Sequence, residues 1–223
     1  MKLDIKKTYD KVVLDVNIEL EEHKIYALIG ANGSGKSTML KSLSSVIKPD
    51  SNSKIDMSFK DKYYMPQNPF TFDLSVFNNI KLGIPTALSF GEKLYCKYEI
   101  ENMMRAIDLY QLRKANAKTL SGGEKQKMAL LRSLVLKHDL LLLDEPTSAM
   151  DINATIKAED IIRDYKEKHN NTIIIATHSI RQAERLADVV LYIENGQIKE
   201  IADAHTFIDS PQTQELKDFL LKI

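Results

Sequence analysis

The sequence predicts an α/β fold with a mainly parallel sheet, and three observations lead to this fold class. Short, continuously apolar segments are typical of strands buried on both faces, and they occupy residues 25–29, 140–143 and 173–176. Segments with helical patterning lie between and around them, at residues 36–46, 128–136 and 153–168. A glycine-containing loop joins the first apolar segment directly to a helical one. Because strands alternate with helices, parallel pairing of the strands is favoured.

The first half of the chain adds peripheral elements to this core. Residues 12–20 end in an alternation of apolar and polar residues, as a half-buried strand does. Residues 49–64 are polar, and we expect them to form a peripheral strand pair. Residues 75–109 have the pattern of helix, loop and helix, with Ser75 as a helix cap. The region from Ser75 to Leu136 therefore has the character of a helical insertion.

The last part of the chain is predicted to contain a hairpin and a terminal helix. Two predicted strands, 189–193 and 197–201, flank Asn195-Gly196, which is a strong signal for a two-residue turn. In the tail, Ser210 is expected to cap a helix whose first residue is Pro211.

Composition narrows the classes of function. Lys and Arg together number 31, as do Asp and Glu, so no basic excess indicates a nucleic-acid partner. The single cysteine, Cys96, cannot form an intramolecular disulfide, which is consistent with a reducing compartment. The first residues lack the apolar core of a signal peptide, and no stretch approaches the ~18 apolar residues of a membrane span. We therefore expect a protein that is soluble by itself and reaches a membrane only through a partner.

Five of the eight glycines lie in two short loops. The first loop, residues 30–38, matches G-x-x-x-x-G-K-[ST], follows a predicted strand and opens a helix, as a phosphate-binding loop requires. Its backbone N–H groups and the positive helix end bind phosphate oxygens. Lys36 would reach the β- and γ-phosphates of ATP, and the Ser37 hydroxyl would bind Mg²⁺. The predicted nucleotide-binding residues of this loop are Gly30, Asn32, Gly33, Ser34, Gly35, Lys36, Ser37 and Thr38.

The second loop has the sequence Leu120-Ser121-Gly122-Gly123-Glu124-Lys125-Gln126. Ser121 and Glu124 form an S-x-x-E capping box, so this loop is also a helix start. On spacing alone, a simple capped helix remains an equal alternative to a functional motif.

The second loop resembles the signature motif of the ABC ATPases, and the resemblance extends over nearly the whole chain. Residues 140–143 followed by Asp144 and Glu145 resemble the family's Walker B strand and catalytic glutamate. Ser148-Ala149-Met150-Asp151 is similar to its D-loop, with methionine where leucine is usual. Gln67 matches the Q-loop, and His178 resembles the switch histidine. The resemblance implies one ABC ATPase domain over 1–223, a phosphate-binding-loop NTPase core with antiparallel N-terminal strands and a helical subdomain inserted over approximately 70–136.

The resemblance also implies the site chemistry. Asp144, with Ser37 and Gln67, would hold the Mg²⁺ shell, while Glu145 would polarise the attacking water. A lone histidine at a strand end is usually structural, but its motif favours contact of His178 with the γ-phosphate. The catalytic set is thus Glu145, His178, Lys36 and Gln67. The family stacks adenine on an aromatic ring near the N-terminus, and Tyr9 is the best candidate, with a surface tyrosine in a turn as the alternative.

In this family two subunits pair head to tail. The resemblance therefore implies that Ser121, Gly122, Gly123 and Asp151 help to bind the nucleotide of a second copy, or of a homologous subunit. A multi-span membrane permease would dock a short helix in a groove near the Q-loop. Phe70, Phe72, Val76 and Phe77 are candidates for that groove, and core packing is the alternative for each.

We therefore expect an ATP-binding, ATP-hydrolysing subunit of an ABC transporter on the cytoplasmic face of the cell membrane. Residues 65–80 resemble uptake ATPases of the tungstate, molybdate and phosphate type, which favours an importer of a small solute or oxyanion, with a solute-binding protein as a further partner. Two alternatives stay open: an exporter ATPase on a separate chain, and a soluble ABC ATPase such as those of iron–sulfur cluster assembly.

Overall fold

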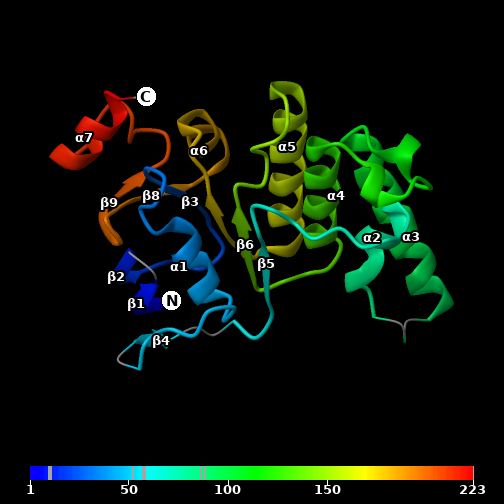
Figure 1. Ribbon diagram of the computed structural model, residues 1–223, viewed down its shortest axis with the longest axis horizontal. Helices are drawn as coiled ribbons and strands as arrows, with labels where there is room; N and C mark the ends of the chain where they lie inside the picture. Colours follow the sequence, from blue (N-terminus) through cyan, green and yellow to red (C-terminus); the bar gives the residue numbers. More distant parts are fainter. Residues whose placement is uncertain (10–11, 52, 57–58, 86, 88, 223) are drawn as a thin grey trace. The chain divides into compact units, whose positions relative to one another are not determined.

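A computed structural model describes residues 1–223 except 10–11, 52, 57–58, 86, 88 and 223 (Figure 1). The chain divides into two compact units. The first contains Met1–Tyr64, His138–Glu145 and Asn170–Ile223, and the second contains Met65–Lys137 and Pro146–His169.

The first unit is built on a six-stranded sheet, which confirms the mainly parallel α/β core. Its strand order is β5 (Lys62–Met65), β6 (Leu140–Asp144), β7 (Thr172–Ala176), β3 (Ile25–Ile29), β8 (Val189–Glu194) and β9 (Gln197–Asp203). The pairs β6/β7, β7/β3 and β3/β8 are parallel, whereas the predicted hairpin β8/β9 is antiparallel. Every residue of β3, β6 and β7 is buried, as their continuously apolar sequences predict.

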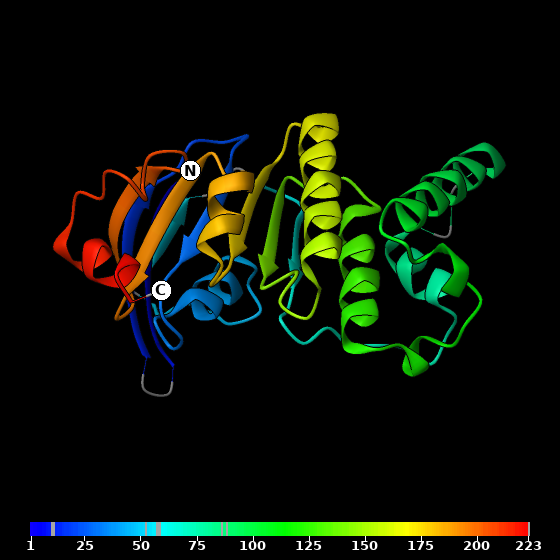
Figure 2. The ribbon, with the colours of Figure 1, turned by 90° about the horizontal axis from the view of Figure 1, so that it is seen from above.

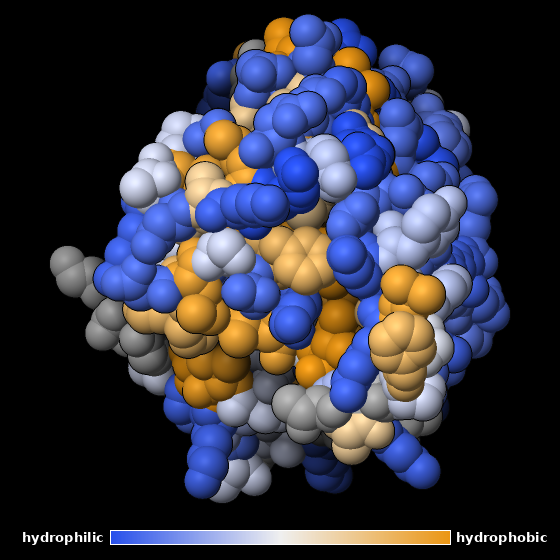
Figure 3. Space-filling view, turned by 90° about the vertical axis from the view of Figure 1, so that its right-hand side faces the viewer, coloured by the Kyte–Doolittle hydropathy of each residue, from blue (hydrophilic) through white to orange (hydrophobic). Residues whose placement is uncertain are grey.

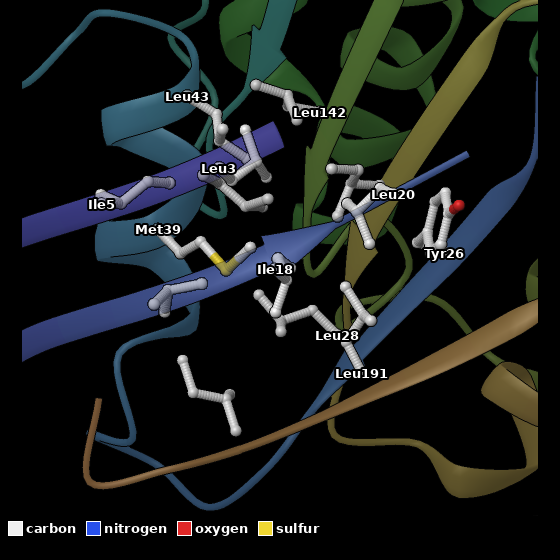
Figure 4. Packing of buried hydrophobic residues seen from close by; sticks show 14 of the residues in the cluster. Leu3, Ile5, Ile18, Leu20, Tyr26, Leu28, Met39, Leu43, Leu142 and Leu191 are labelled. Atoms are coloured by element: carbon white, nitrogen blue, oxygen red, sulfur yellow. The ribbon is translucent and has the colours of Figure 1, made fainter. Parts of the chain in front are cut away.

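A three-stranded antiparallel sheet covers the core of this unit. Its order is β2 (Val12–Glu19), β1 (Lys2–Tyr9) and β4 (Lys54–Asp56). Alternate residues of β1 and β2, such as Leu3 and Val16, point inward and pack with helix α1 (Lys36–Leu43) and with β3. Figure 4 shows Met39 of α1 and Leu28 of β3 among these side chains.

The prediction that two strands within residues 49–64 pair with each other is wrong. Both strands exist, but β4 pairs with β1, and β5 joins the six-stranded sheet beside β6. The carbonyl of Asp61 accepts hydrogen bonds from the N–H groups of Asp139 and Leu140, at 3.0 and 3.1 Å, and this contact starts β5 alongside β6. Each of the two strands therefore finds its hydrogen-bonding partner in a strand that is distant in sequence.

The terminal helix begins later than predicted. Helix α7 spans Gln214–Leu220, and its cap is Thr213, whose side chain accepts a hydrogen bond from Leu216 N. The Glu200 carboxylate of β9 accepts from the N–H groups of Gln212 and Thr213, at 3.0 and 2.7 Å, and from the Thr213 hydroxyl at 2.6 Å. These bonds hold the segment before Gln214 outside the helix. A further helix, α6 (Ile180–Leu186), follows β7 and is absent from our sequence predictions.

The second unit is helical. It contains α2 (Val76–Ile80), α3 (Phe90–Ala106), α4 (Gly122–Leu134) and α5 (Ile152–His169), with short 3₁₀ segments at Lys81–Gly83, Tyr110–Leu112 and Ala117–Thr119. Ser75 caps α2, and the Ser121–Glu124 capping box opens α4, as predicted. Figure 2 shows α4 and α5 side by side within this unit. In the described part of the chain, none of the helices has the length and apolar character needed to span a membrane.

Candidate active site

The phosphate-binding loop (residues 30–38) has the backbone that its glycines predict. Gly30 has φ of 152°, and a Cβ atom there would lie 2.2 Å from the carbonyl oxygen of Ile193 in β8. Only glycine therefore allows the loop to leave β3 so close to the neighbouring strand. Gly35 is the N-cap of α1 and offers no side chain to the first turn of the helix. The N–H groups of that turn are thus available for an anion.

The turn of the β8/β9 hairpin is hydrogen-bonded to this loop. Gly196 N donates to Ser34 O at 2.8 Å, and Gly196 O accepts from Asp15 N of β2 at 2.9 Å. Asn195 and Gly196 have φ of 49° and 77°, which the two-residue turn requires. Sequence reasoning predicted the turn but not its contact with the phosphate-binding loop, because nothing local signals that contact.

Lys36 is a buried cation at the start of α1. Its ammonium group donates to the carbonyl oxygens of Gly30 and Ala31, at 2.7 and 3.1 Å. Burial lowers the pKa of Lys36, and the negative charges of Glu145 and Asp144 oppose this shift. The lysine therefore lies in a site where an anionic ligand would compensate a buried positive charge.

Asp144, at the end of β6, is held by two hydroxyl groups. Ser37 Oγ donates to its Oδ1 at 3.0 Å, and the Tyr64 hydroxyl donates to its Oδ2 at 2.9 Å. Burial, together with the negative charge of Asp144, raises the pKa of Tyr64. Hydroxyl and carboxylate oxygens are the hard ligands that Mg²⁺ prefers, so the predicted pair of Ser37 and Asp144 fits this ion. Tyr64 is a site residue that sequence reasoning missed.

Glu145 and His178 form a hydrogen-bonded pair. His178 Nδ1 lies 2.7 Å from Glu145 Oε2, and the side chains are 65% and 9% exposed, respectively. Through this contact Glu145 orients the imidazole ring of His178. Glu145 also has φ of 51°, in the left-handed region, and its N–H donates to Ala176 O at 2.9 Å. Strained non-glycine residues of this kind cluster at functional sites.

The remaining motif residues lie in the second unit. Gln67 is exposed, two residues after β5. Gln126 of α4 ties the signature segment (residues 120–126) to the D-loop (residues 148–151): its amide donates to Ser148 Oγ at 3.0 Å and accepts from Ala149 N at 2.7 Å. A Cβ atom at Gly123 would lie 2.8 Å from Ala149 O, so these two motifs pack closely. Asp151 accepts a hydrogen bond from Ala154 N at 2.8 Å, at the start of α5.

Asn32, Thr38 and Tyr9 were also predicted to bind the nucleotide. Asn32 is exposed, and Thr38 is half-buried in the first turn of α1. Tyr9 ends β1, but its side chain lies outside the described part of the structure. Thus the first unit brings together the phosphate-binding loop, Asp144, Glu145 and His178, whereas Gln67, the signature segment and the D-loop belong to the second unit.

The aromatic cluster after Gln67 is partly exposed. Phe70 and Phe72 are 68% and 42% exposed, Phe77 is half-buried, and Val76 is fully buried. Val76 therefore takes the core-packing alternative. On the face of the second unit seen in Figure 3, apolar side chains gather in patches among hydrophilic ones.

Comparisons with known proteins identify the family of this chain. The family model described as ABC transporter matches residues 13–148. The phosphate import ATP-binding protein PstB of Staphylococcus saprophyticus is 28% identical over 98% of this chain and 81% of its own length.

Solved structures share the fold. An ATP binding subunit of an ABC transporter has a TM-score of 0.82 at 23% identity, covering 99% of this chain and 98% of its own. A dimeric ATP-binding cassette in a post-hydrolysis state, bound to ADP and Pi, has a TM-score of 0.76 at 23% identity, covering 92% and 98%. The protein cbiO1 of Clostridium perfringens, part of the transporter complex cbiONQ, has a TM-score of 0.75 at 22% identity, covering 100% and 98%. The chain belongs to the ABC transporter family and is one of its ATP-binding, ATP-hydrolysing subunits.

Proposed function

We propose that this subunit drives an importer of a small solute, with an oxyanion such as phosphate as the first candidate. The observation that carries this proposal is the similarity to a phosphate import ATP-binding protein over 98% of the chain. The phosphate-type pattern of residues 65–80 supports the same direction of transport.

The chemistry of hydrolysis follows from the first unit. Lys36 binds the β- and γ-phosphates, as the lysine of a phosphate-binding loop does. Glu145 orients and polarises the attacking water, and its contact with His178 orients the carboxylate. His178, held by Glu145 through Nδ1, presents Nε2 to the γ-phosphate. Such preorganised donors stabilise the charge that develops in the transition state.

Ser37 and Asp144 of the first unit would hold Mg²⁺, whereas a role of Gln67 as a further ligand is supported by its Q-loop motif alone. When bound, the ion neutralises negative charge on the phosphate groups. Within the described residues, the 3.0 Å contact between Ser37 Oγ and Asp144 Oδ1 supports this assignment, because it places two hard oxygen donors side by side.

ATP binding closes a head-to-tail dimer. Ser121, Gly122 and Gly123 of one subunit meet the γ-phosphate bound by Lys36 of the other, which is a second copy or a homologous subunit. The tight packing of Gly123 on Ala149 supports movement of the signature segment and the D-loop, with Asp151, as one piece. The dimeric, ADP- and Pi-bound state of the related cassette is consistent with such a cycle. Hydrolysis removes the bridging phosphate and allows the dimer to open.

The exposed pair Phe70 and Phe72 is the docking surface for a membrane permease, which holds the subunit on the cytoplasmic face of the cell membrane. The two rings pack edge to face at 4.8 Å between centroids. Arg132 of α4 holds the backbone of this segment, since its Nη1 donates to Phe70 O at 3.1 Å. Exposed aromatic rings on a fixed backbone suit the insertion of a short partner helix.

Transport assays in the native host test this proposal. A strain that lacks the chain should take up radiolabelled phosphate, or tungstate and molybdate, more slowly. The intact gene should restore uptake, and Glu145→Gln should not. A multi-span membrane protein and a solute-binding protein should co-purify with the subunit from detergent extracts. Unchanged uptake together with slower release of a solute would instead assign the subunit to an exporter.

A further inference from the structure

We propose that Tyr64 is a positioning residue for magnesium binding: its hydroxyl fixes the Asp144 carboxylate so that Oδ1 faces Ser37. This inference rests on the proposed role of Ser37 and Asp144 in holding Mg²⁺. It adds a residue of β5 that lies outside the family motifs described above.

The two oxygen atoms of Asp144 are held from different elements. Ser37 of α1 donates to Oδ1 at 3.0 Å, and Tyr64 of β5 donates to Oδ2 at 2.9 Å. Rotation of the carboxylate would therefore break both hydrogen bonds at once. The Tyr64 contact is the one that leaves Ser37 free to change partner, because it still orients Asp144 when the Ser37 hydroxyl binds a ligand.

Tyr64 is itself held in place. It lies in β5, next to β6 in the sheet, and its ring packs against the buried core cluster of the first unit. A planar, packed phenol has few alternative positions for its hydroxyl group.

Tyr64 is predicted to affect the affinity for Mg²⁺ more than the affinity for the nucleotide. Groups that orient a metal ligand without touching the metal contribute about 10–100-fold to metal affinity. Loss of the hydroxyl should thus weaken Mg²⁺ binding, whereas nucleotide contacts made by the phosphate-binding loop should remain. A residue that only packs in the core would change stability and leave the magnesium dependence unaltered.

The experiment compares Tyr64→Phe with Tyr63→Phe. Tyr63 is the adjacent tyrosine of β5, and its ring centroid lies 5.0 Å from that of His138. The control therefore also removes a tyrosine hydroxyl, from a residue whose ring has a different neighbour. Both changes are made in a Glu145→Gln background, which is expected not to hydrolyse ATP. Binding of a fluorescent ATP analogue is followed by anisotropy, first in EDTA and then over a series of Mg²⁺ concentrations, and melting temperatures are recorded.

We expect the Mg²⁺ concentration at half-saturation to rise on the order of 10-fold for Tyr64→Phe. Affinity in EDTA should stay within about twofold, and Tyr63→Phe should match the parent. An unchanged or lower half-saturating Mg²⁺ concentration would overturn the role, even if the protein melts earlier. If Tyr64→Phe does not fold, Tyr64→Met removes the same hydroxyl and is judged by the same criterion. A parent protein whose nucleotide binding ignores Mg²⁺ would overturn the magnesium site itself, and this outcome is visible before any Tyr64 variant is measured.

Discussion

Replacement of Gly196 by alanine should destabilise the protein more than the same replacement at Gly33. Both glycines have similar positive φ, 77° and 80°. A Cβ atom at Gly196 would lie 1.9 Å from the carbonyl oxygen of Val13, whereas one at Gly33 would meet nothing within 4 Å. The two variants therefore share the cost of the left-handed backbone and the change in unfolded-state entropy. They differ only in the collision with β2.

The difference can be estimated from the contacts of the turn. The collision at Gly196 is with backbone, so the turn must move. Movement breaks the hydrogen bonds from Asp15 N to Gly196 O and from Gly196 N to Ser34 O. Each backbone hydrogen bond contributes about 1 kcal/mol net, so the difference between the variants is about 2 kcal/mol. For a chain of this size that difference corresponds to about 4–8 °C in melting temperature.

Differential scanning fluorimetry without nucleotide measures this difference directly. Gly196→Ala should melt about 4–8 °C below Gly33→Ala. It should also bind ATP more weakly than the parent, because Gly196 holds the phosphate-binding loop at Ser34. If the two variants melt together, the hairpin turn does not support the loop, and our reasoning about it is wrong.

Three further predictions concern the site. His178→Ala should lower kcat by about 100-fold with a much smaller change in the KM for ATP, and unchanged turnover would exclude His178 from the chemistry. Because the pKa of Lys36 is lowered from 10.5 by burial, the folded state binds fewer protons than the unfolded chain between that lowered value and 10.5. The difference in unfolding free energy between the parent and Lys36→Met should therefore rise with pH in this window. Urea unfolding of both proteins from neutral to alkaline pH measures this difference, and a constant difference would contradict the prediction. Ser121→Ala and Ser89→Ala each remove the cap of a capping box and should each cost about 1 kcal/mol, but only Ser121→Ala should lower ATPase activity. If Ser121→Ala and Ser89→Ala had equal ATPase activities, Ser121 would act only as a helix cap.

Most of the fold could be predicted from the sequence, because many of its elements are determined by residues that lie close together in the chain. The apolar segments became β3, β6 and β7, and Asn195-Gly196 made the hairpin turn. The signature helix starts at its capping box, since both partners lie within three residues.

The predictions failed where distant partners decide the structure. The cap of α7 is Thr213 rather than Ser210 because Glu200, on β9, takes the backbone N–H groups before the helix. The two strands within residues 49–64 lie in different sheets, because each pairs with a strand that is distant in sequence, β4 with β1 and β5 with β6.

The candidate site shows the same division. The phosphate-binding-loop motif predicts Lys36 from sequence, and the resemblance to the ABC ATPases predicts Asp144 and Glu145. Tyr64 carries no such signal, because its partner Asp144 is 80 residues away. Glu145 likewise donates its N–H to Ala176 of the neighbouring strand while its backbone is left-handed, and neither feature has a local sequence signal.

The head-to-tail dimer is the central claim about mechanism, and the mass of the Glu145→Gln protein in ATP and Mg²⁺ tests it most directly. Light scattering after gel filtration should give the mass of two chains with ATP-Mg²⁺ and of one chain with ADP or with EDTA. Adding Ser121→Arg, which places a large charged side chain in the signature segment, should return the protein to one chain. A Glu145→Gln protein that remains a single chain at saturating ATP-Mg²⁺ would contradict ATP-driven closure.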